Sequence, residues 1–326
     1  MDQDLDIIAV QETKVESVDA TESLLQRFTG RYTASGSVCS YAGTRRIPCH
    51  PTSPMPRSNS QRADEPQGIR EWPYTTASEA GLIDTHCHLD YVFTRTGHTK
   101  SFTHFHLANR NTFPYCYNGA RGYTDVVERY LARTLGDSSV VALGEIGLDY
   151  SISGNDTVPD WKEFKRTQEV AFRRQLVLAR RRRLPLVIHS RDATADTIRI
   201  LKEMVPADQP IHRPAAPIHR HCFTGNWDEA KHWLDTFPRL CLGITPLVGF
   251  SGVDPLVEAT QRIPLDRLLL ETDAPFFLPK RESGRLACSH PGMVIHVATK
   301  VAAIRDISVD VLISAVRDNT RRVYGI

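Results

Sequence analysis

The stretch Leu82–Asp90, LIDTHCHLD, begins as a short apolar strand and ends in alternating histidines. On a β-strand, residues two apart point to the same side, so His86 and His88 can reach one metal ion together. A lone pair of this kind is a weak indication of a metal site. The stretch decides the fold because the same arrangement, an apolar strand followed by a potential ligand, recurs along the chain.

Four further apolar segments end in a side chain that can bind a metal: Glu145 ends VALGE, His189 ends LVIH, His221 ends IHRH and Asp273 ends LLLETD. Taken singly, His189 fits a hydrogen-bonded core histidine, Glu145 a helix N-cap and Asp273 a cap on the turn before Pro275. As a set they are harder to explain structurally, because each would cost several kcal/mol if buried without a partner.

Amphipathic helical stretches separate the apolar segments, at 124–135, 161–183 and 228–237. Strands that alternate with helices predict a parallel sheet covered by helices. A chain of 326 residues is long enough for two domains or for one large α/β barrel. In such a barrel the carboxyl ends of the strands meet at one face, where active sites lie, so we expect the six ligand candidates to converge there.

Composition excludes several classes of protein. Lys and Arg number 40 and Asp and Glu 38, for a net charge of +2, which is unlike a disordered acidic chain or a strongly basic nucleic-acid coat protein. No uncharged stretch reaches the ~18–20 residues of a membrane span. The acidic N-terminus and the seven cysteines without a CxxC pair predict a nuclear or cytoplasmic protein that is not secreted.

Three regions are expected along the chain. Residues 1–43 contain the short apolar run DIIAV, residues 44–80 carry six prolines among polar residues, and the alternating pattern occupies 81–326. Closely spaced prolines prevent helices and sheet ladders, so 44–80 is predicted to be a disordered linker.

Five motifs, in order, resemble the signature of the TatD-family metal-dependent deoxyribonucleases: IDTHCHLD, GEIGLDY, PLVIHSRDA, HCFTG and ETDAPFFLP. The likeness is greatest to the animal TatD domain-containing protein 2 branch, through IHRHCFTG and the SHPG of 289–292. It covers residues 81–326 and implies a TIM-type (β/α)8 barrel, phosphodiester hydrolysis and a two-metal site.

The resemblance also implies the role of each ligand. One divalent ion would be bound by His86, His88, Glu145 and Asp273, and a second by Glu145, His189 and His221, with Glu145 bridging. Two such ions can lower the pKa of a bridging water, orient it and neutralise the phosphate, with Glu145 and Asp273 as catalytic residues and Asp273 as general base.

Phosphate contacts are expected from four basic side chains, for which a solvated loop is the alternative: Arg191, Lys280, Arg281 and Arg285. The family implies magnesium, whereas the imidazole and carboxylate ligands also suit Mn or Zn. The implied partner is a nucleic acid, DNA or RNA; nothing in the sequence points to a membrane or to a protein partner.

The chain departs from the family between IDTHCHLD and GEIGLDY. The family places two further strands there, the second ending in G-x-H-P, but residues 101–118 do not resemble two buried strands. We therefore expect an incomplete barrel without strands 2 and 3, which cannot close with eight-strand geometry unless other segments substitute.

The N-terminal DIIAVQETK resembles the start of the exonuclease-endonuclease-phosphatase superfamily, including retroelement endonucleases, in which the residue matching Glu12 binds a metal. That fold needs a much longer chain, so residues 1–43 are interpreted as a non-functional fragment.

Three hypotheses follow for the whole chain: a metal-dependent nuclease that acts through a metal-activated water, a catalytically impaired relic of one, and an amidohydrolase-like enzyme acting on a small-molecule ester or amide. The absence of a lysine at a strand end, with Glu145 in the place of a carboxylated lysine, disfavours the third.

Overall fold

The computed structural model describes residues 5–13, 39–47, 82–88, 117–137, 140–152, 160–205, 216–280, 282–283 and 286–326, with backbone alone for the first two ranges and for 117–119. Within these ranges eight strands form one sheet: β1 (Leu5–Thr13), β2 (Cys39–Ile47), β3 (Ile83–Cys87), β4 (Val140–Asp149), β5 (Leu186–Arg191), β6 (Ile218–Arg220), β7 (Leu240–Ile244) and β8 (Leu268–Leu270).

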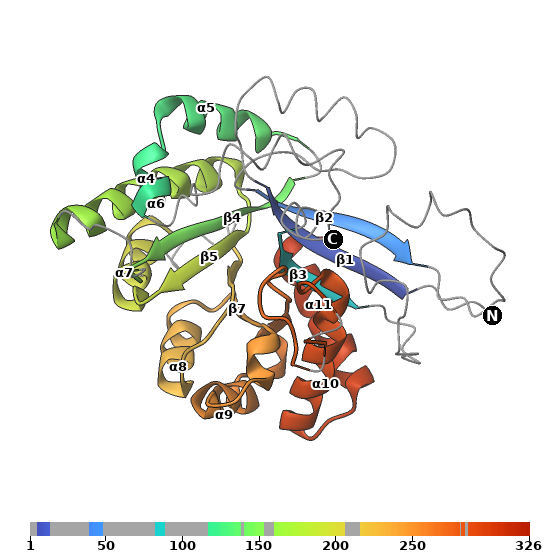
Figure 1. Cartoon of the computed structure of the whole chain (residues 1–326). Coiled ribbons are helices and arrows are strands. Elements are labelled where there is room, and N and C mark those ends of the chain that lie inside the picture. The colour runs from blue at the N-terminus through green and yellow to red at the C-terminus, as the bar shows by residue number, and fades with distance from the viewer. Residues whose placement is uncertain are drawn as a thin grey trace.

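The described helices surround this sheet (Figure 1). They are α4 (Tyr117–Gly122), α5 (Asp125–Thr134), α6 (Trp161–Arg182), α7 (Thr194–Met204), α8 (Trp227–Thr236), α9 (Asp254–Arg262), α10 (Val294–Arg305) and α11 (Val309–Tyr324), with 3₁₀ turns η2 (Pro246–Gly249), η3 (Leu265–Arg267) and η4 (Pro291–Met293).

The strand order is β3-β1-β2-β4-β5-β6-β7-β8, and each strand from β4 to β8 pairs in parallel with the next. The segment after β8 returns to β3: Cys87 forms a parallel bridge with Ala274, and the Asp273 amide donates to the His86 carbonyl at 3.0 Å. The α/β architecture predicted from the alternating pattern and the TIM-type barrel implied by the resemblance are confirmed.

An N-terminal strand pair stands between β3 and β4. β1 runs parallel to β3, with Ile8 opposite Ile83, and β2 runs antiparallel to both β1 and β4, with Ser40 opposite Ala142. The described residues between β3 and β4 form helices α4 and α5 and no strand. The facing edges of β3 and β4 are thus paired by β1 and β2. Most of this strand pair comes from residues 1–43, which were predicted to be a separate fragment.

The structure also differs from the expected boundary at residues 43 and 44. β2 crosses it and ends at Ile47, because residues 44–47 pair with β1. The remainder of the predicted linker lies outside the described residues.

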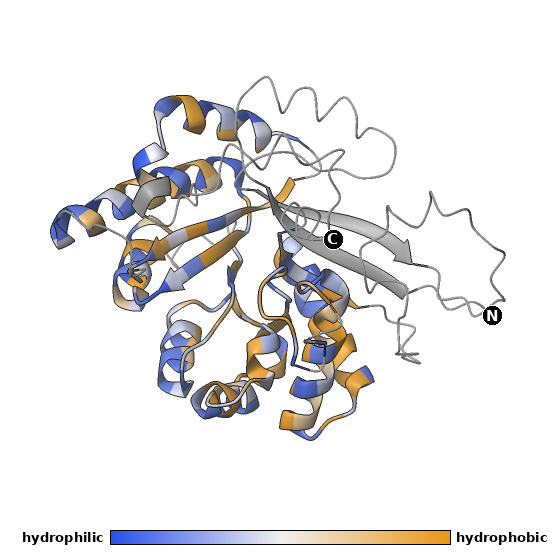
Figure 2. Cartoon of the chain, in the orientation of Figure 1, coloured by the Kyte–Doolittle hydropathy of each residue, from blue (hydrophilic) through white to orange (hydrophobic). Residues whose placement is uncertain are grey.

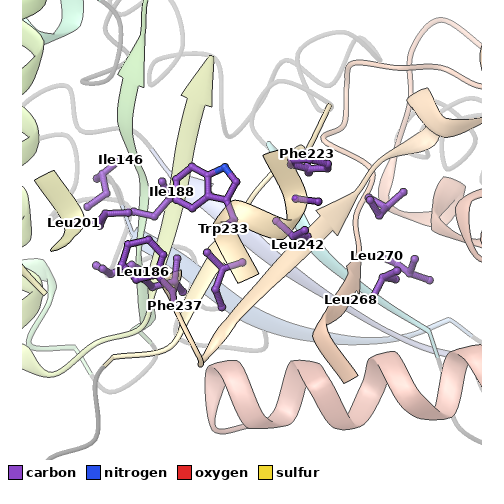
Figure 3. Close-up of a cluster of buried hydrophobic side chains, with 14 of the residues drawn as sticks. Ile146, Leu186, Ile188, Leu201, Phe223, Trp233, Phe237, Leu242, Leu268 and Leu270 are labelled. Atoms are coloured by element: carbon purple, nitrogen blue, oxygen red, sulfur yellow. The ribbon is translucent and has the colours of Figure 1, made fainter. Parts of the chain in front are cut away.

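Strand residues alternate between two buried environments. On β7, Leu240, Leu242 and Ile244 belong to the core that packs under the helices, whereas Cys241 packs with Leu269 in a separate small cluster. Figure 3 shows the larger core, with Trp233 of α8 beside Leu242. Because both strand faces are buried, polar side chains on the second face must find partners within the barrel.

Apolar and polar residues alternate on the helices in Figure 2, as the amphipathic pattern predicted. The stretches expected at 124–135, 161–183 and 228–237 are α5, α6 and α8, which begin after the N-caps Thr124, Asp160 and Asn226. Within the described residues, no helix combines the length and apolar character that crossing a membrane requires.

Two glycines bring β4 close to β5 beside Glu145. The register shifts between Leu143 and Ile146, which is a bulge at Gly144 and Glu145. Gly147 has φ of 149°, and a Cβ there would lie 1.8 Å from the His189 carbonyl oxygen. The motif GEIG therefore needs glycine for the close approach of two strands that carry ligand candidates.

Replacing Ala9 by proline tests the N-terminal strand pair. Ala9 lies opposite both Gly43 and Asp84 in the middle of the sheet, where a proline removes a ladder donor. We expect Ala9→Pro to lower the melting temperature, by about 2–4 °C for each kcal/mol lost, and the control Ala9→Gly, which keeps the backbone donor and adds no atoms, to lower it much less. Equal melting of the three proteins would show that β1 is not part of the sheet.

Replacing Gly147 by alanine tests the close approach of β4 and β5. We expect Gly147→Ala to destabilise the protein by about 1–3 kcal/mol or more, because the added methyl group meets backbone. Gly249→Ala is the matched control, since its Cβ would meet nothing nearer than Lys300 Cγ at 4.0 Å. Urea unfolding measures both; equal midpoints for the two variants would contradict the prediction.

Candidate metal centre

All six ligand candidates lie at the carboxyl ends of the strands. His86 and His88 come from β3 and the residue after it, Glu145 from the β4 bulge and His189 from β5. His221 follows β6 directly, and Asp273 follows β8 by three residues. Five of these side chains belong to residues that are at most 8% exposed, and His189 is partly buried.

The six residues form three overlapping groups, in each of which the potential ligand atoms lie within 4.8 Å of one another: His86, His88 and Glu145; His86, His221 and Asp273; and Glu145, His189 and His221. Glu145 is common to the first and third groups. The convergence expected from the strand ends is therefore present in the structure.

Glu145 is the most closely surrounded of the six. Its Oε2 lies 3.0 Å from His189 Nδ1 and 3.1 Å from His221 Nε2, and its Oε1 lies 3.8 Å from His88 Nε2. One carboxylate thus faces three imidazoles from three strands. Glu145 is therefore the point of contact between the first and third ligand groups.

Asp273 approaches the histidines from the opposite side. Its Oδ1 lies 3.2 Å from His88 Nε2 and 3.6 Å from His86 Nε2. The residue has φ of 51°, in the left-handed region that Asp tolerates better than most side chains. It is 8% exposed, so its carboxylate is the acid of the cluster with some access from solvent.

His86 supplies an observation that fits a metal ion. Its ring is fully buried, and neither ring nitrogen has a hydrogen-bond partner among the described residues. The centroid of its ring is 3.9 Å from that of His221, which is itself a cation when its imidazole is protonated. Leaving a polar group unpaired costs about 1–3 kcal/mol, which coordination would offset. Imidazole nitrogens with carboxylate oxygens suit Zn, Mn and related divalent ions.

The charges of the cluster are interdependent. Burial by itself would raise the pKa of Glu145, but the charge of His221 and hydrogen bonds from both His189 and His221 hold it well below its usual value. Burial would lower the pKa of His221, but the charges of Glu145 and Glu271 raise it well above its usual value. Burial, reinforced by His221, lowers the pKa of His86, so its imidazole is neutral and keeps a lone pair for a cation.

Three acids next to the ligands were not predicted from the sequence. Asp149 Oδ2 lies 3.2 Å from His189 Nε2, and Glu271 Oε2 lies 3.5 Å from His221 Nδ1. Asp84 accepts hydrogen bonds from the amide of Thr272 at 2.8 Å and from its hydroxyl at 2.5 Å, which ties β3 to the segment after β8. Asp84 and Glu271 lie two residues before His86 and Asp273, so the two-residue strand period is the signal that could have found them.

Of the four basic residues predicted to contact phosphate, the structure describes two, Arg191 and Lys280. Arg191 ends β5 and is exposed, and the exposed Lys280 donates to the Ser251 hydroxyl at 3.1 Å. Arg281 and Arg285 lie outside the described residues.

The chain is similar to known proteins over this same region. The family model of the TatD related DNases matches residues 112–325. The human 3'-5' RNA nuclease TATDN2 is 34% identical over 284 residues, covering 76% of this chain; the chain thus spans 36% of that relative's length. The 3'-5' ssDNA/RNA exonuclease TatD of Yersinia pseudotuberculosis is 38% identical over 209 residues, covering 63% of this chain and 74% of the relative.

A solved structure shows the same fold. The crystal structure of YjjV, a TatD homolog from Escherichia coli, superposes with a TM-score of 0.53 at 24% identity, covering 65% of this chain and 74% of the other. The family match over more than half of the chain, supported by the Yersinia relative, establishes that this chain belongs to the TatD related DNase family.

Proposed function

We propose that this chain is a divalent-metal-dependent nuclease that hydrolyses phosphodiester bonds of DNA or RNA. The observation that carries the proposal is the set of three overlapping ligand groups at the carboxyl ends of the strands, two of which share Glu145. The names of the human and Yersinia relatives, an RNA nuclease and an ssDNA/RNA exonuclease, support nucleic acid as the substrate.

The ligands divide between two cations as the family resemblance implied. His86, His88, Glu145 and Asp273 would bind one ion, and Glu145, His189 and His221 the other. Two bound ions, with Mg favoured by the family and Mn or Zn as alternatives, would lower the pKa of a water between them and neutralise charge on the phosphate.

The chain's own residues supply positioning and proton transfer. Asp273 is proposed to take the proton of the attacking water, since it is an acid of the cluster with access to solvent. Glu145 holds His189 and His221 at 3.0 and 3.1 Å. Asp149 orients His189 from the other ring nitrogen at 3.2 Å.

Four basic residues are proposed to contact the phosphate: Arg191, Lys280, Arg281 and Arg285. Residues 81–326 are proposed to carry all of the catalytic groups, and residues 1–43 none, so that the β1–β2 pair contributes to the barrel wall alone. A nuclear or cytoplasmic location is proposed from the seven cysteines of the sequence, which include no CxxC pair.

Replacing Glu145 or Asp273 by alanine tests the catalytic assignment. With Mg or Mn we expect the protein to degrade a labelled single-stranded oligonucleotide, and each variant to lower kcat by about 10²–10⁴. The matched control is Glu258→Ala, an exposed acid of α9 that pairs with Arg262 at 2.8 Å.

The outcomes separate the three hypotheses. Cleavage by both variants at the wild-type rate would refute the site. A wild type that melts without cooperativity and cleaves nothing would indicate the impaired relic. Turnover of an ester or lactone panel without nuclease activity would indicate the amidohydrolase-like alternative.

Metal addition gives a second test that does not depend on activity. At a concentration 100 times the dissociation constant, Mn²⁺ should stabilise the metal-free protein by about 2.7 kcal/mol, because only the folded chain presents the ligands together. EDTA should reverse the rise in melting temperature, and His189→Ala should reduce it while Glu258→Ala keeps it. An identical rise in His189→Ala would place the ion elsewhere.

A further inference from the structure

A line of buried polar groups connects the C-terminal helix to the metal centre. The Tyr324 hydroxyl at the end of α11 lies 2.6 Å from His219 Nδ1. His219 Nε2 lies 3.1 Å from Glu271 Oε2, and the same oxygen lies 3.5 Å from His221 Nδ1. These are ion-pair distances, because none of the three atoms meets the geometry of a hydrogen bond among the described residues. All four residues are at most 5% exposed, so these contacts are shielded from water.

A glycine provides the space for this line. Gly243 lies on β7, between the strand that carries His219 and the segment that carries Glu271. A Cβ at this position would lie 2.3 Å from His219 Nε2 and 2.5 Å from Glu271 Oε1. The meeting of the imidazole and the carboxylate inside the barrel therefore depends on the missing side chain of β7.

The distances favour one arrangement of the protons along the line. The Tyr324 hydroxyl is 2.6 Å from His219 Nδ1 and 3.5 Å from the Thr85 carbonyl, so the ring nitrogen is its better acceptor. A neutral His219 that accepts at Nδ1 carries its proton on Nε2, the nitrogen that faces Glu271. Without the Tyr324 hydroxyl, His219 can also adopt the tautomer with its proton on Nδ1. In that tautomer the lone pair of Nε2 faces the Glu271 carboxylate.

The line ends at a proposed metal ligand. When a cation takes the place of the proton on Nε2 of His221, a carboxylate 3.5 Å from Nδ1 favours keeping the other proton on that nitrogen. That Nε2 lies 3.1 Å from Glu145 Oε2, inside the ligand group formed by Glu145, His189 and His221. The position of the Glu271 carboxylate thus decides which nitrogen of His221 can bind a cation.

We propose that Tyr324 and His219 are positioning residues, which fix Glu271 against Nδ1 of His221 and so direct Nε2 of His221 into the cation site. The inference rests on the proposed metal-dependent function. It predicts a change in metal affinity, and a change in turnover as the consequence.

Tyr324→Phe removes one hydroxyl and keeps the buried ring. Tyr130→Phe is the matched control, because Tyr130 is a tyrosine of α5 buried to a similar degree, 7% against 5% exposed. We expect Tyr324→Phe to weaken Mn²⁺ binding, measured by calorimetry on the metal-free protein, by about 10–100-fold. In wild type and Tyr130→Phe the affinities should agree.

A double-mutant cycle with His219→Leu separates positioning from general loosening. If the two residues act through one line, the loss in Tyr324→Phe/His219→Leu should be about that of the larger single variant rather than the sum. Melting of the metal-free proteins should differ much less than their Mn²⁺ affinities, and the loss in turnover should appear in kcat rather than KM.

Either of two results would overturn the inference: unchanged Mn²⁺ affinity in Tyr324→Phe, or fully additive losses in the cycle. Because the affinity measurement needs no substrate, a wild type that binds Mn²⁺ but cleaves no nucleic acid would refute the proposed nuclease activity and leave the positioning result standing. A Tyr324→Phe protein that melts far below Tyr130→Phe without metal would assign the hydroxyl to stability and also count against the inference.

Discussion

The buried carboxylate of Glu145 is the constraint on which the rest of the site depends. An anion inside a barrel must be compensated, and two imidazoles meet one of its oxygens at 3.0 and 3.1 Å. Their positions follow from the strands that carry them, and the bulge of β4 with the glycine at 147 brings those strands close enough. The four residues GEIG therefore supply both the buried carboxylate, at Glu145, and the glycine that lets the strand carrying His189 approach it.

Much of this could be predicted from the sequence, because strands buried on both faces appear as continuous apolar runs. The strands Leu240–Ile244 and Leu268–Leu270 are such runs, and the six ligand candidates were found as polar residues ending runs of this kind. Glu271 and Asp84 were not predicted, since their roles depend on partners in other strands: His219 and His221 for Glu271, and Thr272 for Asp84. Sequence spacing shows which face a residue occupies, but not what lies opposite.

The pairing of the N-terminal strands also could not be predicted from the sequence. The apolar run Asp6–Val10 could be recognised as a strand, and β1 contains it. Its position between β3 and β2 could not be predicted, because pairing between distant segments is set by which edges remain open after the rest of the barrel has formed. The resemblance implied that the chain lacks two family strands between β3 and β4, and among the described residues β1 and β2 pair at that position.

The presence of β1 and β2 between β3 and β4 is compatible with the site for a physical reason. The six ligand candidates come from β3, β4, β5, the residue after β6 and the segment after β8, so none belongs to the replaced part. A strand next to the site has to satisfy the hydrogen-bonding groups of β3 and β4, and backbone of either direction can do so. Its own side chains are not required for the chemistry. A barrel that concentrates its ligands on the remaining strands can therefore accept an antiparallel pair in the gap, as long as the edges beside His86 and Glu145 stay paired.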